Sequence, residues 1–78
     1  MVLDRFGKLL RDIRITRSLL LYDMAKDLGM TSAELSGIEC GRKPIPTDFI
    51  FKLQTHYDIG KSCQSMLELF AKEREAQT

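Results

Sequence analysis

The stretch LYDMAKDLGMTSAELSGIECGRKPIP, residues 21–46, decides the fold of this chain because it contains two short helical patterns separated by a glycine. The apolar residues of the first pattern fall at helical spacing: Leu21, Met24, Ala25 and Leu28. Gly29 is expected to end this helix, since glycine enters the left-handed conformation without strain. Thr31 is a good N-cap for the next helix, and Glu34, three residues later, completes a capping box. The stretch therefore predicts a helix, a tight turn and a second helix.

The second helix of this stretch is expected over residues 32–40, with Leu35 and Ile38 as its apolar face and Gly41 as its stop. Its remaining positions are mostly Ser, Ala and Gly. Small residues on an outward helix face allow close approach to another surface, such as a groove of DNA. The segment RKPIP that follows predicts a loop, because its two prolines remove amide donors and disfavour helix in the residues before them.

Two further helices are predicted on either side of this stretch. In residues 4–17, Asp4 can cap a helix whose apolar stripe is Phe6, Leu9, Leu10 and Ile13. In residues 48–57, Thr47 is expected to cap a helix whose inward residues are Phe49, Ile50, Leu53 and Tyr57. Both patterns have one apolar side, so both helices are expected to pack against the central pair.

A fifth helix is predicted over residues 61–77, where the apolar residues again have helical spacing: Cys63, Met66, Leu67 and Phe70. After about Lys72 the sequence is polar, and we expect this end to fray. No strand pattern or internal repeat is present, and 78 residues provide for one domain. The sequence therefore predicts a single all-α domain over residues 1–78, a five-helix bundle with short loops.

The net charge of +1 gives no global electrostatic signature, so binding to nucleic acid would depend on where the charges lie. The first 17 residues carry five cations against two acidic residues, whereas residues 18–39 carry four acidic residues against Lys26 alone. A solvated basic face is the expected role of most cations in the first helix: Arg5, Lys8, Arg11 and Arg17. Charge is therefore distributed in local patches.

No enzyme, metal or cofactor chemistry is predicted. Cys40 and Cys63 have no metal-ligand spacing, and His56 has no nucleophile or carboxylate at catalytic spacing. Two thiols in so short a chain indicate reduced residues rather than a disulfide framework. The start MVLDRFGKLL lacks the pattern of a signal peptide, and no apolar run reaches the length of a membrane span. A cytoplasmic protein that does not enter membranes is expected.

Three segments carry a family resemblance: FGKLLRDIR, LYDMAKDLGMTSAELSGIECGRKPIP and FIFKLQTHYDI. From Phe6 to about Ile59 they resemble the Cro and phage-repressor type of helix-turn-helix proteins, also called the XRE-like family. The positions that match in order and spacing are Phe6, Leu10, Arg14, Ala25, Leu28, Gly29, Leu35, Ser36, Ile38, Glu39, Gly41 and Pro44. The resemblance implies a helix-turn-helix motif over about residues 21–40, with a scanning helix followed by a recognition helix.

Site residues follow from the resemblance by position. The positions implied to meet base edges are Ser32, Ala33 and Gly37. Those implied to approach phosphates are Thr31, Ser36, Arg42 and Lys43. The resemblance also implies a buried ion pair between Arg14 and Glu39, structural in role, that joins the first and third helices. No long Arg, Gln or Asn stands on the recognition face, so DNA shape would contribute to specificity.

The resemblance implies a sequence-specific transcriptional regulator, a repressor that binds a palindromic operator in double-stranded DNA as a homodimer. Its half-sites would lie about 34 Å apart, one helical turn of DNA. The C-terminal helix, about residues 61–75, is a candidate dimerisation element, because its apolar cluster is wider than one stripe.

An alternative is a protein-interaction module on the same scaffold, such as an antitoxin that neutralises a toxin or a phage protein that binds another regulator. Leu20 and Leu21 stand where the family often has Ser or Thr followed by Gln. Leu20 and Tyr22 are expected to be exposed and to offer an apolar surface to a partner. Glu34 and the near-neutral charge also motivate this alternative.

Overall fold

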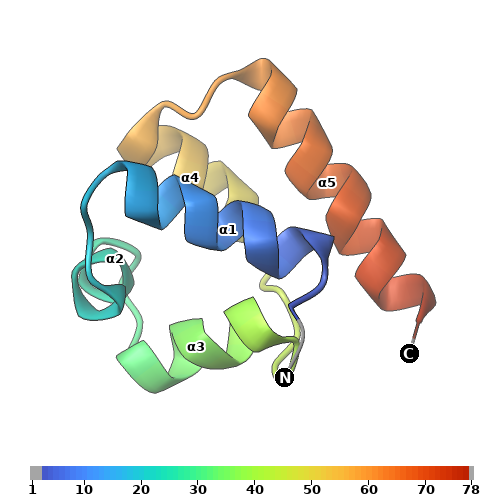
Figure 1. Cartoon of the computed structure of the whole chain (residues 1–78), viewed down its shortest axis with the longest axis horizontal. Coiled ribbons are helices and arrows are strands. Elements are labelled where there is room, and N and C mark those ends of the chain that lie inside the picture. The colour runs from blue at the N-terminus through green and yellow to red at the C-terminus, as the bar shows by residue number, and fades with distance from the viewer. Residues whose placement is uncertain (1–2, 78) are drawn as a thin grey trace.

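A computed structural model describes residues 3–77 of the chain, and in this range it contains five α-helices and no strand (Figure 1). The helices are α1 (Arg5–Thr16), α2 (Leu21–Asp27), α3 (Ser32–Cys40), α4 (Phe49–Tyr57) and α5 (Lys61–Ala76). The predicted all-α fold is confirmed. The predicted span of 1–78 includes residues 1, 2 and 78, which lie outside the described range.

Helix α1 lies at the centre of the molecule, with α3 and α5 packed against it (Figure 1). Helix α2 packs on α3, and α4 packs on α5. Each helix contributes to one apolar core, whose buried side chains among residues 3–77 are Phe6, Leu10, Ile13, Met24, Ala25, Leu28, Leu35, Ile38, Phe49, Leu53 and Leu67. Full burial of a large apolar side chain contributes about 1.5–3 kcal/mol, so this core is the main source of stability.

The backbones of α1 and α3 approach each other closely at Gly7. A Cβ atom at this position would overlap the backbone carbonyl oxygen of Glu39 in the last turn of α3. Gly7 is therefore required by the crossing of the two helices, although its own helix would favour a better helix former. The contact fixes the C-terminal end of α3 against the N-terminal end of α1.

The corner between α2 and α3 has the predicted local structure. Gly29 has φ +71°, and Gly41, which ends α3, has φ +82°, so both glycines adopt the left-handed conformation. The hydroxyl of Thr31 accepts a hydrogen bond from the Glu34 amide at 3.1 Å, and the Glu34 carboxylate accepts one from the Thr31 amide at 3.0 Å. Both stop signals and the capping box are confirmed.

Two local predictions are wrong. Thr47 does not cap α4: the N-cap is Asp48, whose φ of −98° and ψ of 6° are not the extended values that let a side chain reach back to the first amides. Its carboxylate instead pairs with Lys52 at 3.5 Å. Nor does the fifth helix fray after Lys72, since α5 continues to Ala76.

Within residues 3–77, no helix has both the length and the apolar character needed to cross a bilayer.

Candidate nucleic-acid interface

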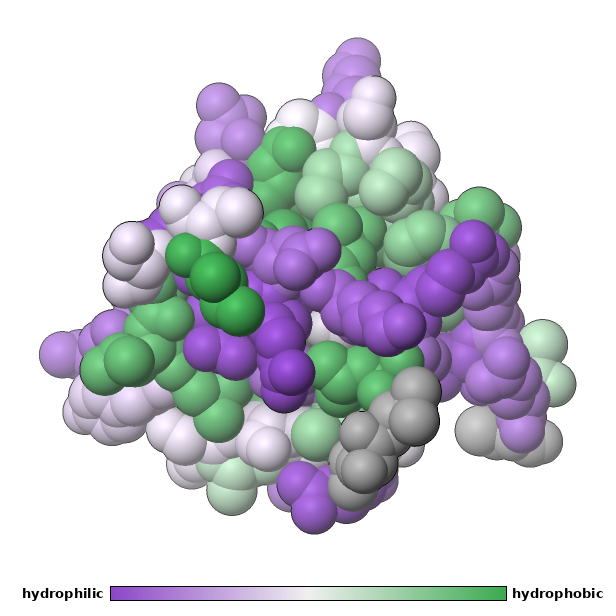
Figure 2. Space-filling model, viewed as in Figure 1, coloured by the Kyte–Doolittle hydropathy of each residue, from purple (hydrophilic) through white to green (hydrophobic). Residues whose placement is uncertain are grey.

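The outer face of α3 is accessible and is formed by small side chains. Thr31 and Ala33 are exposed, and Ser32 and Ser36 are half-buried. Positions 32, 33 and 36 lie on one side of the helix, away from the buried Leu35. Along the lower edge of Figure 2, over α3, the surface is mostly pale, which marks side chains of intermediate hydropathy. Four predicted contact residues therefore share one uncovered face.

Gly37 lies on this side of α3 but is buried, so its predicted role at a base edge needs correction. The side chain of Lys43 covers it: a Cβ at Gly37 would lie 2.8 Å from Cγ and 3.0 Å from Cδ of Lys43. The Gly37 carbonyl also accepts hydrogen bonds from the amides of Arg42 and Lys43, at 2.8 and 3.1 Å. Here the outer surface is the aliphatic stem of Lys43, because the loop after Gly41 folds back onto the helix.

Arg42 and Lys43 are both exposed. The hydrogen bonds from their backbone amides to the Gly37 carbonyl hold them beside the C-terminal end of α3. The side chain of Lys43 lies over Gly37, beside the outer face of α3. The two cations can therefore meet the same partner as the small residues of α3.

Glu34 adds a negative charge at the N-terminal end of α3. Its pKa is lowered, first by the hydrogen bond from the Thr31 amide and then by the Thr31 hydroxyl, so the carboxylate is ionised at neutral pH. The Thr31 hydroxyl oxygen accepts a hydrogen bond from the Glu34 amide within the capping box, and the Thr31 side chain also stabilises the ionised Glu34 carboxylate. The N-terminal end of the helix face thus carries a carboxylate, whereas Arg42 and Lys43 add positive charge after its C-terminal end.

Arg14 and Glu39 lie together, as the resemblance implies. The Glu39 side chain is 5% exposed, and its Oε1 atom accepts bonds from Arg14 at 3.5 Å and from Arg11 at 3.1 Å. Arg14 also donates to the Leu19 carbonyl at 3.4 Å. This arrangement ties α1 to α3 and leaves Glu39 with no role at the surface.

The expected solvated basic face of α1 is exposed at Arg5, Lys8 and Arg11, whereas Arg17 is half-buried. Three of these four cations also have partners within the protein. Arg11 pairs with Glu39, and Arg5 pairs with Glu73 while lying 4.5 Å from the centre of the Phe70 ring. Arg17 donates to the backbone carbonyls of Ile13 and Tyr57, at 3.0 and 3.1 Å. The planar guanidinium has five donors and stacks on aromatic rings, so arginine finds such partners more readily than lysine.

Apolar side chains are exposed at the start of α2, as expected. Leu20 is 71% exposed and Tyr22 is 65% exposed. The Leu20 amide donates to the Asp23 carboxylate at 3.0 Å, so a negative charge stands beside them. The start of α2 therefore presents an apolar surface with a carboxylate beside it.

No group of three or more His, Cys, Asp or Glu side chains among residues 3–77 is placed to hold a metal ion. Across known proteins, neither a family model, nor a curated protein, nor a solved structure matches this chain.

Proposed function

We propose that this protein is a sequence-specific DNA-binding regulator, a repressor, in which α2 and α3 act as a helix-turn-helix and α3 enters the major groove. The observation that carries this proposal is the outer face of α3, where small accessible side chains lie beside Arg42 and Lys43. A helix with short side chains can approach base edges closely, and cations at its end can bind phosphates.

Each residue of this face has a distinct role in the proposal. Ser32 can donate to or accept from a base edge, and Ala33 can contact a thymine methyl group. Thr31 stands at the N-terminal end of α3, where a phosphate can approach it, while Arg42 and Lys43 bind phosphates by charge. Two copies related by a two-fold axis would place two such helices in successive major grooves, about 34 Å apart.

Electrostatics make this binding modest. Glu34 repels phosphates, and Lys43 compensates for it only in part. The affinity should therefore depend on few phosphate contacts, with a loss of about 0.9 in the slope of log K against log salt for each contact removed. Sequence-dependent DNA shape would provide the remaining specificity.

The test is selection of duplexes from a random DNA pool by the purified protein, followed by binding titrations at several salt concentrations. We expect inverted half-sites. Arg42→Ala should weaken binding severalfold and reduce the salt slope by about 1. Lys8→Ala removes an exposed cation from α1 and should change neither quantity. Selection of no common sequence, or equal losses in the two variants, would contradict the proposal.

Glu34→Gln is a sharper variant because it changes charge alone. Glutamine also serves in a capping box, so α3 keeps its N-terminal hydrogen bonds. With one fewer negative charge facing the phosphates, the selected duplex should bind severalfold more tightly. Unchanged affinity would mean that Glu34 points away from the DNA.

A second candidate function is a protein-interaction module, such as an antitoxin or a protein that binds another regulator. The exposure of Leu20 and Tyr22 favours it. In this case a co-purifying partner should be lost in Leu20→Ser and retained in an Arg42→Ala, Lys43→Ala double variant. The opposite pattern would support the DNA-binding proposal.

A further inference from the structure

Arg74, in the last turns of α5, contacts two other helices through one guanidinium group. Its Nε and Nη2 atoms donate to the two carboxylate oxygens of Asp4 at 2.6 and 2.7 Å. Its Nη1 atom donates to the Ile38 carbonyl at 2.5 Å, and Nη2 also donates to the Glu39 carbonyl at 3.3 Å. The Arg74 side chain is only 10% exposed. A charged residue near the end of a polar segment is thus buried and fully engaged.

The carbonyls of Ile38 and Glu39 belong to the last turn of α3, where backbone acceptors have no partner within the helix. A positive charge at this end is also favoured by the helix dipole, and α3 has no basic residue in its own last turn. Arg74 therefore provides from another helix the cation that α3 lacks.

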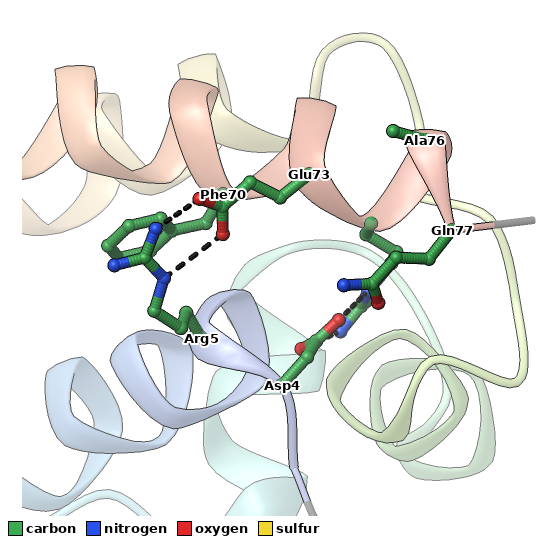
Figure 3. A pocket seen from close by; sticks show the side chains of 7 residues that line it. Asp4, Arg5, Phe70, Glu73, Ala76 and Gln77 are labelled. Atoms are coloured by element: carbon green, nitrogen blue, oxygen red, sulfur yellow. Dashed lines mark hydrogen bonds and ion pairs between the residues drawn. The ribbon is translucent and has the colours of Figure 1, made fainter.

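Asp4 connects this contact to α1. Its carboxylate caps α1 by accepting from the Gly7 amide at 2.8 Å, and the Arg74 guanidinium lowers its pKa. The guanidinium also lies 4.9 Å from the centre of the Phe6 ring. Figure 3 shows Asp4 and Arg5 at the start of α1 facing the end of α5, with Arg5 turned toward Glu73. Two adjacent arginine–carboxylate pairs thus join these helices, and Arg74 alone reaches α3.

The loop that carries the proposed phosphate contacts lies directly beside this guanidinium. Residues 41–45 line a cavity of about 320 Å³ together with Arg74 and Glu75. A Cβ at Gly41 would lie 3.8 Å from the guanidinium carbon of Arg74. The point at which α3 ends and the loop begins is therefore defined by a side chain of α5.

We propose that Arg74 is a positioning residue for the Arg42–Lys43 loop: by holding the last turn of α3, it sets where these two cations lie. As a step toward DNA binding, the inference rests on the proposed function. Arg74 itself touches no DNA. It acts through the α3 carbonyls, so a change at the end of α5 is transmitted to the surface that would meet phosphates.

The first experiment does not involve DNA. Amide hydrogen exchange of Arg42 and Lys43, which bond to the Gly37 carbonyl, is compared with that of Leu35, which bonds to the Thr31 carbonyl at 3.0 Å. In Arg74→Lys, protection at Arg42 and Lys43 should fall about tenfold more than at Leu35, because lysine cannot form the fork that reaches both Asp4 and α3. Arg74→Ala should give the larger effect if it folds.

Arg5→Ala is the matched control. It breaks the neighbouring pair between α1 and α5 without touching α3, so the Arg42 and Lys43 amides should keep their protection relative to Leu35. Equal loss at all three amides in Arg74→Lys, or the same local loss in Arg5→Ala, would overturn the proposal, since Arg74 would then support only the fold in general.

The second experiment measures binding to the selected duplex. Arg74→Lys should weaken binding about threefold or more, and Arg42→Ala should then cost less in this background than in the wild-type protein, because the two changes affect one contact. Full additivity would overturn the positioning role. If the wild-type protein selects no DNA, the proposed function fails, and the exchange experiment still decides whether Arg74 orders the loop.

Discussion

The two ends of α3 are stabilised in different ways. At the N-terminal end, Thr31 and Glu34 form a capping box between residues three positions apart, and both side chains are exposed. At the C-terminal end, Arg74 and Gly7 come from distant parts of the chain and are largely buried. The first end depends on its own sequence, whereas the second depends on the complete assembly of three helices.

This difference has a consequence for local motion. A capping box contributes about 1 kcal/mol, so the first turn of α3 can open while the rest of the molecule remains folded. Opening of the last turn breaks the hydrogen bonds from the Arg74 guanidinium and disturbs the contact at Gly7. Its free energy should therefore be close to that of global unfolding. The base-reading end proposed for α3 is thus the more adaptable end, and the end that carries Arg42 and Lys43 is the more rigid one.

The largest effect is expected from Gly7→Ala, at the rigid end. The new methyl group would overlap the Glu39 carbonyl oxygen, and a backbone atom cannot move aside without shifting α3. We expect a loss of about 3 kcal/mol in the free energy of unfolding, measured by urea denaturation. Gly29→Ala is the control: no atom lies within 4 Å of its Cβ position, so only the strain of its left-handed backbone, about 1 kcal/mol, should appear.

Glu39→Gln should come next, at about 2 kcal/mol, because it leaves Arg14 largely buried without a charged partner. Arg11 is half exposed, so water reduces the penalty on its side of the pair. Glu73→Gln removes a carboxylate from a more exposed pair that water screens, so it should cost much less. Urea denaturation of both variants checks the order, and equal losses would show that burial of Glu39 does not matter.

Asp4→Asn should cost about 1.5 kcal/mol at neutral pH, since asparagine can still cap α1 but loses the charge that faces Arg74. Asp4 has a folded-state pKa below its ordinary value of 3.8, because of Arg74. Its contribution is therefore present above pH 3.8 and is lost as the pH falls through the lower folded pKa. The stability gap between wild type and variant should be constant near neutrality and close at acid pH. A gap that is as large well below pH 3.8 as it is at neutral pH would contradict this assignment.

Thr31→Ala should have a smaller effect than Asp4→Asn, about 1 kcal/mol, because it removes one exposed cap. Thr31→Ser keeps the hydroxyl and should restore most of the loss. Hydrogen exchange should show faster opening in the first turn of α3 and no change at the Arg42 and Lys43 amides. If those amides also lose protection, the two ends of α3 are coupled, and the contrast between them is wrong.

The features that could be predicted from the sequence are mostly those formed by residues close together in the chain, as at the N-terminal end of α3. The glycine stops, the capping box and the apolar stripes of the helices depend on residues within one or two turns. They are confirmed except at Met66, which belongs to the predicted stripe of the fifth helix but is 43% exposed. The uncapped start of α4 is a second local exception, because a turn from Pro46 to Phe49 gives Asp48 the wrong backbone angles.

The features that the sequence did not predict depend on distant residues. Nothing near Lys72 in the chain indicates that Arg74 meets Asp4. The cover of Lys43 over Gly37 is the exception in distance, since it depends on how the loop after Gly41 folds back. Only the family resemblance predicts the Arg14–Glu39 pair. Arg11 also pairs with Glu39, which was not predicted, because it lies about one helical turn before Arg14. Pairing across helices needs the packing to be known first.

The Asp4–Arg74 pair joins residues 70 positions apart, which bears on how the chain folds during its synthesis. A nascent chain emerging from the ribosome has α1, α2 and α3 available long before Arg74 leaves the exit tunnel. Until then the last carbonyls of α3 lack their guanidinium donor, and one side of α1 lacks its cover from α5. Acquisition of the native structure must therefore wait for the final helix, and stalled chains without it would expose apolar surface to chaperones.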